Sequence, residues 1–351
     1  MKRVGIHEIA RLASVSIGTV DRALHNRAGI SEATRKRVLR IAREAGYTPD
    51  LAARALAVGR SQFRIGICIP EEIHFFYDQM RDGIFEEARR SGHLGVELVY
   101  RPVPSLGELE KRQLTSLLHE TIHGLIVVPG SPRIVAPLIN RAESRGIRVV
   151  CISSDAPQSH RSSVVCVNPE LNGLLAAELL SKIVPPSSDV AVVTGMLRTE
   201  DHSQKVKGFR AGFSRHAQGG KIVAVLEAHE SEEESYRKTR ELLSRYPNLR
   251  GIYVSTVNCL PVCCAVKEHK QSTGLRLVTT DLFVEMVPYF ETGIIGGSIY
   301  QDPYTQGRNA VRILVDHLVE KKPIARSNYL NPGIVLQSNL QLFREVRLGA
   351  G

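Results

Sequence analysis

Several carboxyl and amide side chains stand directly after short apolar runs of the sequence. Asp155 follows "RVVCISS", Asn258 follows "GIYVSTV", Asp281 follows "LRLVTT" and Gln301 follows "IIGGSIY". Such groups accept and donate hydrogen bonds. Where they gather at the carboxyl ends of parallel strands, they form a crevice that is suited to a small polar ligand. These residues therefore indicate that the chain binds a small molecule.

The same sequence lacks the residue spacings that mark several common classes of enzyme. No G-x-S-x-G, H-E-x-x-H, P-loop or G-x-G-x-x-G pattern follows a strand-like run. Cys68, Cys151 and Cys166 lie inside apolar runs, which is typical of small core residues. The "CLPVCC" segment has no second Cys or His cluster at metal-ligand spacing. We therefore expect no enzymatic activity, no cofactor and no metal.

The elements that must position these polar groups alternate between strand and helix from residue 63 onward. Apolar runs such as "RIGICIP" and "GLIVVP" are separated by amphipathic stretches such as "MRDGIFEEARRSG". This pattern predicts parallel sheets with helices on both faces. About ten such units exceed a single doubly wound sheet. We expect two lobes, the first at about 63–167 and 300–327 and the second at about 168–299 and 328–351.

The first 64 residues have a different composition. They hold 13 Lys and Arg against 5 Asp and Glu, whereas the remaining 287 residues are nearly balanced at 33 against 31. A basic segment joined to a nearly neutral body indicates contact with a polyanion. A solvated basic tail would have the same composition, so the pattern of apolar residues must decide.

That pattern predicts three short helices in residues 1–48. Residues 6–13 carry apolar side chains at positions i, i+3, i+4 and i+7. Ser16 is suited to cap a second helix over 17–24, and Ser31 is suited to cap a third helix. Two short helices joined by a tight turn and braced by a third form a helix-turn-helix, which holds one helix in the DNA major groove. Double-stranded DNA is therefore the expected partner.

These segments resemble a known family. The stretches "IHEIARLASVSIGTVDRAL", "ISEATRKRVLRIAREAGYTPD" and "LAARALA" are similar, without gaps, to the headpiece of the lac repressor family of bacterial transcription regulators. The resemblance implies a sequence-specific regulator, in the first place a repressor, that binds a nearly palindromic operator as a homodimer. An activator of the same family is the alternative.

In that family the start of the second helix supplies the base-reading side chains, which here are Ile17, Gly18 and Arg22. Arg22 is able to bond guanine O6 and N7 together. Ile17 suits either a thymine methyl group or the core of the head, and Gly18 has no side chain that reads a base. The other predicted contacts are Ser16, Thr19, Ser31 and Thr34 as phosphate-binding hydroxyls, and Asp21, which stands where the family usually has serine.

Residues 49–62 are predicted to form a hinge helix and a linker. The segment "LAARALA" favours a helix but spans only two turns, which is too short to be stable alone in water. The resemblance implies that it forms when paired with a second copy in the minor groove. There Leu56, with Ala53 beside it, would wedge between bases and kink the duplex. A linker helix with Leu56 packed on protein is the alternative.

Residues 63 to about 345 resemble the periplasmic sugar-binding fold that this family attaches to its headpiece. In ribose-type binding proteins the matching positions hold the sugar. That group also places a ligand-contacting arginine where this chain has "DHSQK", so Asp201, His202 or Lys205 is expected to replace it. The predicted effector-binding residues are Phe76, Tyr77, Asp155, His202, Asn258, Asp281 and Gln301, with Phe75 and Ser154 as further candidates. A helix cap at Asp281, and core packing of Phe76 and Tyr77, are the alternatives.

The predicted fold is a small all-α head at 1–48, a hinge at 49–62 and a bilobed α/β domain of two doubly wound parallel sheets at 63–351. No apolar run approaches the ~20 residues of a membrane helix, and the start lacks the apolar stretch of a signal peptide. We therefore expect a cytoplasmic protein that contacts no membrane. A secreted sugar-binding protein and a cytoplasmic sugar-processing enzyme are the rival classes.

Overall fold

The structure is a computed structural model that describes residues 6–24, 28–45, 63–217, 219–269, 274–341 and 343. The chain divides into two compact units, Met1–Ser61 and Gln62–Gly351. The hinge residues Ala53 and Leu56 lie outside the described residues. None of the helices in the described ranges is long and apolar enough to cross a membrane.

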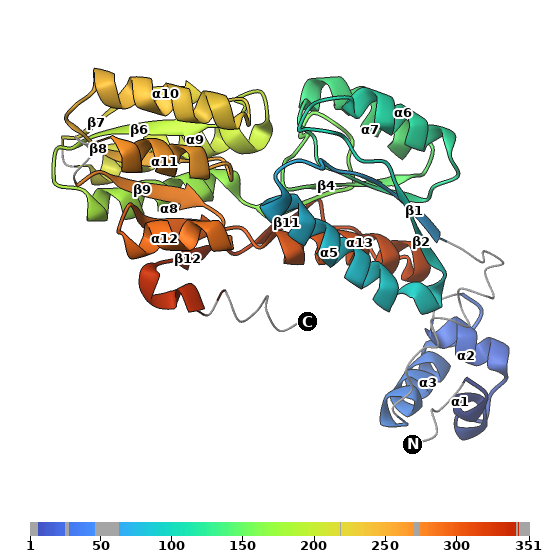
Figure 1. Cartoon of the computed structure of the whole chain (residues 1–351). Helices are drawn as coiled ribbons and strands as arrows, with labels where there is room; N and C mark the ends of the chain where they lie inside the picture. Colours follow the sequence, from blue (N-terminus) through green and yellow to red (C-terminus); the bar gives the residue numbers. More distant parts are fainter. Residues whose placement is uncertain are drawn as a thin grey trace. The chain divides into compact units, whose positions relative to one another are not determined.

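The described residues of the first unit form the helices α1 (Ile6–Leu12), α2 (Ile17–Leu24) and α3 (Glu32–Glu44), in agreement with the predicted head (Figure 1). The Thr19 amide donates to Ser16 Oγ at 3.1 Å, and the Thr34 amide donates to Ser31 Oγ at 3.1 Å. Both serines therefore cap the helices that follow them. Between α1 and α2, Ser14 adopts a positive φ of 50°, which reverses the chain in a tight turn.

One apolar core holds these helices together. Ile9, Val20 and Val38, one from each helix, are completely buried. Ala23 is buried as well, whereas Leu24 is only partly buried. The inward stripe of α2 is therefore Val20 with Ala23, and the partly buried Leu24 packs against the same core. The i, i+3 pair faces the same side of a helix as the i, i+4 pair.

The second unit contains two six-stranded sheets, as predicted (Figure 1). The first has the order β11-β5-β4-β3-β1-β2, and all its strand pairs are parallel. Its strands are β1 (Phe63–Cys68), β2 (Val96–Tyr100), β3 (Gly124–Val127), β4 (Arg148–Ile152), β5 (Ser163–Val167) and β11 (Ser327–Leu330). This sheet thus reaches Leu330, three residues beyond the predicted limit of the first lobe.

Helices cover both faces of the first sheet. Its helices are α5 (His74–Arg90), η1 (Gly92–Leu94), α6 (Glu110–His119), α7 (Pro132–Ser144) and α13 (Pro303–Glu320). The α6 and α7 helices pack on one face, in a core that also contains Cys68, Cys151 and Cys166. These three cysteines are core residues, as predicted. The α5 and α13 helices pack against each other and cover the other face (Figure 1).

The second sheet has the order β12-β10-β9-β8-β6-β7, and only its edge pair β10–β12 is antiparallel. Its strands are β6 (Asp189–Thr194), β7 (Lys221–Glu227), β8 (Leu249–Val254), β9 (Arg276–Thr280), β10 (Ile295–Tyr300) and β12 (Gly333–Val335). Its helices are α8 (Pro169–Ile183), α9 (Glu200–His216), α10 (Glu232–Arg245), α11 (Leu260–Glu268), η2 (Val284–Met286), α12 (Val287–Glu291) and η3 (Gln337–Asn339). The chain crosses between the lobes after β5, after β10 and after β11.

Alternate residues of the second sheet's strands enter two separate cores. Val190 and Val192 face α8 and α9, whereas Ala191 and Val193 face α10, α11 and α12. The α9 helix packs very close to α8. A Cβ atom on Gly208 would lie 2.0 Å from the Glu170 carbonyl oxygen, so only glycine at this position allows the close approach. This close approach fixes the start of α9 relative to the sheet.

Candidate functional site

The α2 helix of the head presents an exposed face that carries the three residues predicted to read bases. Ile17 is 42% exposed, so it stands outside the core and leaves its apolar side chain accessible. A Cβ atom on Gly18 would lie 3.8 Å from a guanidinium nitrogen of Arg22, and one on Gly29 would lie 3.7 Å from Arg22 Nε. The exposed Arg22 side chain therefore extends between two glycines that leave it uncovered.

The predicted phosphate-binding hydroxyls form two pairs at the starts of α2 and α3. Ser16 Oγ lies 2.9 Å from Thr19 Oγ1, and Ser31 Oγ lies 2.8 Å from Thr34 Oγ1. The amide groups at helix N-termini favour anions, so both pairs lie where phosphate oxygens would be stabilised. Asp21, partly exposed on α2, stays a predicted contact.

In the second unit, residues that follow strands of both sheets enclose a cavity of about 30 Å³. This volume holds about two water molecules, so the lobes are closed around a space much smaller than a ligand pocket of roughly 300–1,000 Å³. A neighbouring cavity of about 280 Å³ shares Ser153, Ser154 and Asp201 with it. The smaller cavity is lined by Ile73, Phe76, Tyr77, Leu106, Val128, Ser153, Ser154, Thr199, Asp201, His202, Lys205, Glu230, Val257 and Gln301.

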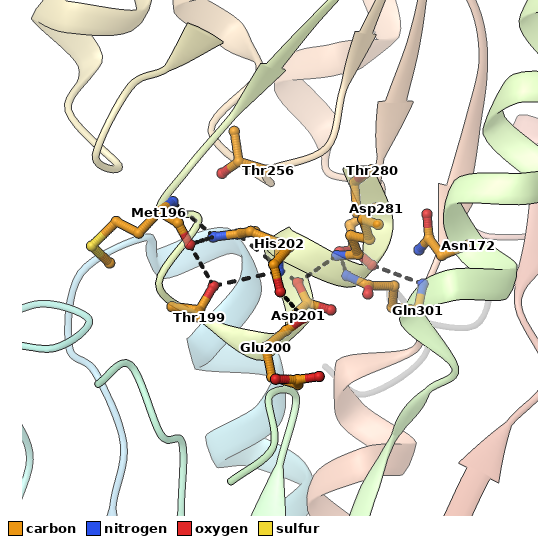
Figure 2. Close-up of polar contacts among 12 residues, drawn as sticks. Asn172, Met196, Thr199, Glu200, Asp201, His202, Thr256, Thr280, Asp281 and Gln301 are labelled. Carbon is orange, nitrogen blue, oxygen red and sulfur yellow. Dashed lines mark hydrogen bonds and ion pairs between the residues drawn. The ribbon is translucent and has the colours of Figure 1, made fainter. Parts of the chain in front are cut away.

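The start of α9 contributes a buried group of charged residues (Figure 2). Lys205 Nζ donates to Asp201 Oδ2 at 2.7 Å. His202 Nδ1 lies 2.9 Å from the Met196 amide nitrogen and 3.2 Å from the Met196 carbonyl oxygen. His202 Nε2 in turn lies 3.2 Å from Glu230 Oε1. The "DHSQK" stretch therefore places Asp201, His202 and Lys205 together at the cavity.

Glu230 was missed by the sequence analysis. It ends the "VLEAHE" run after β7, and its side chain is only 4% exposed. Both His229 and Glu230 have positive φ angles, 51° and 59°, which bend this loop toward the cavity. A Cβ atom on Gly195 would lie 1.7 Å from Glu230 Oε1 and 2.4 Å from His202 Cε1. Only a glycine at 195 leaves room for this acid–histidine pair.

Asn258 holds the Glu230 loop and does not line the cavity. Asn258 Nδ2 donates to the Glu230 carbonyl oxygen at 3.1 Å. Thr256 Oγ1 donates to Glu230 Oε2 at 2.6 Å and accepts from the Asn258 amide at 3.2 Å. The structure therefore gives Asn258 a positioning contact, through which it orients the Glu230 side chain.

Asp281 and Gln301 point toward one another across two strand ends (Figure 2). The Gln301 amide donates to Asp281 Oδ1 at 2.8 Å, and Gln301 Nε2 donates to Asp281 Oδ2 at 2.6 Å. Gln301 lines the cavity, and Asp281 orients it from behind. The helix that follows, η2, has Phe283 at its N-cap position, so the alternative of a cap at Asp281 does not hold.

The predicted aromatic residues lie at the start of α5. Phe76 and Tyr77 are 3% and 4% exposed, and both line the cavity, so core packing and contact with the cavity coincide. Burial, followed by the nearby carboxylates with Glu230 first among them, raises the pKa of Tyr77 well above its usual range. Phe75 instead stacks on Phe283 of the second lobe.

Asp155 does not line the smaller cavity. Its carboxylate accepts from Arg161 Nε and Nη2, and Arg161 Nη1 donates to the Arg326 carbonyl oxygen at 2.7 Å. This ion pair lines the larger cavity instead. Within the described ranges, no three His, Cys, Asp or Glu side chains are grouped so as to hold a metal ion.

Comparison with known proteins gives this arrangement a family. A model described as "Periplasmic binding protein domain" matches residues 65–322, and one described as "Bacterial regulatory proteins, lacI family" matches residues 5–50. The chain therefore belongs to the periplasmic binding protein domain family, and its head is the helix-turn-helix of the lacI family of bacterial regulatory proteins.

Proteins similar over nearly the whole chain are transcription regulators. The HTH-type transcriptional repressor PurR of Aliivibrio fischeri is 24% identical over 343 residues, covering 95% of this chain and 98% of that protein. Catabolite control protein A of Priestia megaterium is 23% identical over 322 residues, covering 90% and 92%. A solute-binding protein of an ABC transporter from Burkholderia graminis, in complex with D-arabinose, superposes with a TM-score of 0.73 at 22% identity, covering 80% of this chain and 97% of its own.

Proposed function

We propose that this protein is a transcriptional repressor whose affinity for operator DNA is controlled by a small sugar-like effector bound between the lobes. One observation carries the proposal. The same chain joins a basic helix-turn-helix head, with an exposed reading face on α2, to a bilobed domain whose strand ends meet around a polar cavity. The similar repressors support the first half of this function, and the fold of the arabinose-bound solute-binding protein supports the second half.

The head contacts DNA through α2 and the starts of α2 and α3. Arg22 reads a guanine, Ile17 contacts a thymine methyl group, and the hydroxyls of Ser16, Thr19, Ser31 and Thr34 bind phosphates. One such helix reads too few base pairs for useful specificity, so the protein acts as a homodimer on two half-sites. The hinge pairs in the minor groove with Leu56 as its wedge. This work takes place in the cytoplasm, where the operator lies.

The effector occupies the cleft when the lobes open and close around it. Gln301, Asp201 and His202 line this cleft, and Tyr77 and Phe76 face them from the first lobe. Asp281 and Asn258 position these groups from behind. The protein catalyses no reaction, so the bound effector leaves unchanged. It alters DNA affinity only through its different affinity for the open and closed bodies.

The test begins with selection of duplexes from random DNA by the full-length protein. A nearly palindromic site bound by two copies is expected. Fluorescence anisotropy on that site, with and without each sugar of a panel, should find one compound that changes DNA affinity by about 5-fold to 150-fold. Failure to prefer any sequence over random duplex at 0.15 M salt would refute the proposed DNA binding. A reporter gene behind the site should be more active in cells that lack the protein, and the reverse would indicate an activator.

A further inference from the structure

The two cavities between the lobes are lined by more carboxylates than cations. The carboxylates are Asp155, Glu170, Glu200, Asp201 and Glu230, and the cations are Arg161 and Lys205. Glu72 of the first lobe lines neither cavity, but its carboxylate accepts at 2.7 Å from the amide of Leu106, which lines the smaller one. Burial raises the pKa of Glu72, and repulsion by Glu230 of the other lobe raises it further. The cleft therefore presents a negative potential to whatever enters it.

Each of the two lining cations already pairs with one of these carboxylates. Arg161 donates through two nitrogens to Asp155, and its third nitrogen donates to a backbone carbonyl oxygen. Lys205, with a side chain only 2% exposed, bonds Asp201. His202 Nε2 lies 3.2 Å from Glu230 Oε1. Glu170 pairs with Lys207 at 3.3 Å. A phosphate or carboxylate entering the cleft would have to break one of these ion pairs or lie beside Glu200 and Glu230, and both are unfavourable.

Two residues that line both cavities each have a buried oxygen atom without a partner among the described residues. These atoms are Ser154 Oγ from the first lobe and Asp201 Oδ1 from the second. Ser154 is 4% exposed and Asp201 is 8% exposed. Buried polar atoms are almost always hydrogen-bonded. A ligand hydroxyl is able to donate to Asp201 Oδ1 and to pair with the Ser154 hydroxyl in either direction, whereas a phosphate dianion has no proton to donate to Asp201.

We propose that this cleft selects a hydroxylated ligand without a negative charge, and that it rejects the phosphorylated or carboxylated form of the same molecule. The selection rests on the proposed function, because it assigns the chemistry of the effector to the site already described. Asp201 determines this selection, because its Oδ1 has no partner among the described residues and its Oδ2 accepts from Lys205.

The first experiment uses matched pairs of compounds with the full-length protein. Isothermal titration compares D-ribose with D-ribose 5-phosphate, D-glucose with D-glucose 6-phosphate, and D-galactose with D-galacturonate. In at least one pair the neutral sugar should bind at least tenfold more tightly than its charged partner. Tighter binding of a charged member would overturn the inference, but it would not affect the proposal that the protein is a sugar-responsive regulator. No binding by any member at 10 mM would overturn the sugar effector, and the inference with it.

The second experiment changes the deciding residue. Asp201→Asn keeps the shape of the side chain but releases the Lys205 ammonium group beside the cavity. The neutral sugar should bind at least tenfold more weakly, and the charged partner should gain affinity. Glu178→Gln is the matched control, because Glu178 pairs with Lys182 at i, i+4 on a solvent-facing side of α8, 3.1 Å apart. An Asp201→Asn protein with unchanged discrimination would show that other groups make the selection.

Discussion

Phe75 of the first lobe stacks on Phe283 of the second, with ring centroids 4.1 Å apart and ring planes inclined by 16°. Phe75 immediately precedes the cavity residues Phe76 and Tyr77 on α5, and it packs against the apolar core of the second lobe. Opening the cleft must separate these two rings. The stack therefore favours the closed body.

The first prediction concerns this stack. Replacing Phe75 with Ala should destabilise the closed body by the ~0.5–1.5 kcal/mol of an aromatic pair, and so weaken effector binding by about two- to tenfold. Small-angle X-ray scattering of the free protein should show a larger radius of gyration. Phe85→Ala is the control, because Phe85 is on the same helix but is 44% exposed. An unchanged radius and affinity in Phe75→Ala would mean that the stack does not hold the lobes together.

The second prediction concerns base reading by Arg22. Arg22→Ala should cost about 1–3 kcal/mol of operator affinity and relax one base position in each half-site. Anisotropy titrations on single-base variants of the operator would measure both effects. Arg40→Ala removes an exposed arginine of α3 that pairs with Glu44 at 3.1 Å, and serves as the control. If Arg22→Ala weakens all sequences equally, Arg22 contacts a phosphate only.

The third prediction concerns the hinge, which lies outside the described residues. Leu56→Ser should lose most of the specific DNA affinity, since the wedge that offsets the unstacking of bases is gone. Effector affinity should be unchanged, because the residues proposed to bind the effector belong to the second compact unit and residue 56 belongs to the first. Anisotropy and calorimetry on the same preparation separate the two readouts. Full operator affinity in the variant would mean that the hinge is an inert tether.

The fourth prediction concerns Gly195. A Cβ atom there would lie 1.7 Å from Glu230 Oε1, so Gly195→Ala must displace Glu230 and His202. We expect loss of effector binding and a decrease of about 1–3 kcal/mol in the free energy of unfolding, as for other overpacked sites. Gly92→Ala, where no atom lies within 4 Å, is the control and should change neither. Calorimetric titration and urea denaturation provide the measurements. Effector binding that survives in Gly195→Ala would remove the Glu230–His202 pair from the site.

Much of the fold was predictable because it depends on local periodicity. The three head helices follow from apolar residues at helical spacing and from capping by Ser16 and Ser31. The parallel sheets follow from continuous apolar runs separated by amphipathic helices. A strand end likewise pointed to Gln301, and the resemblance to ribose-type binding proteins pointed to His202; both residues line the cavity.

The roles within the site were less predictable, because a polar side chain at a strand end is able to bond any of several neighbouring groups. The Asp155 carboxylate lies next to Arg161, six residues further along the chain, and forms an ion pair with it. Asn258 bonds the loop of Glu230, 28 residues before it. Glu230 reaches the cavity only through two consecutive residues with positive φ, a conformation that the "AHE" sequence does not favour. These contacts depend on tertiary structure, and no spacing in the sequence reports them.

The repeated crossing of the chain between the lobes also constrains how the protein is made. The first lobe begins at residue 63, yet its helix α13 and its edge strand β11 arrive only after most of the second lobe has been synthesised. Until then, the sheet edge at β5 lacks its partner strand, and the face opposite α6 and α7 is covered by α5 without α13. Exposed strand edges and apolar faces promote aggregation. The nascent chain therefore passes through a stage at which the lobe that starts first is the one still incomplete, and this stage is where chaperones would be needed most.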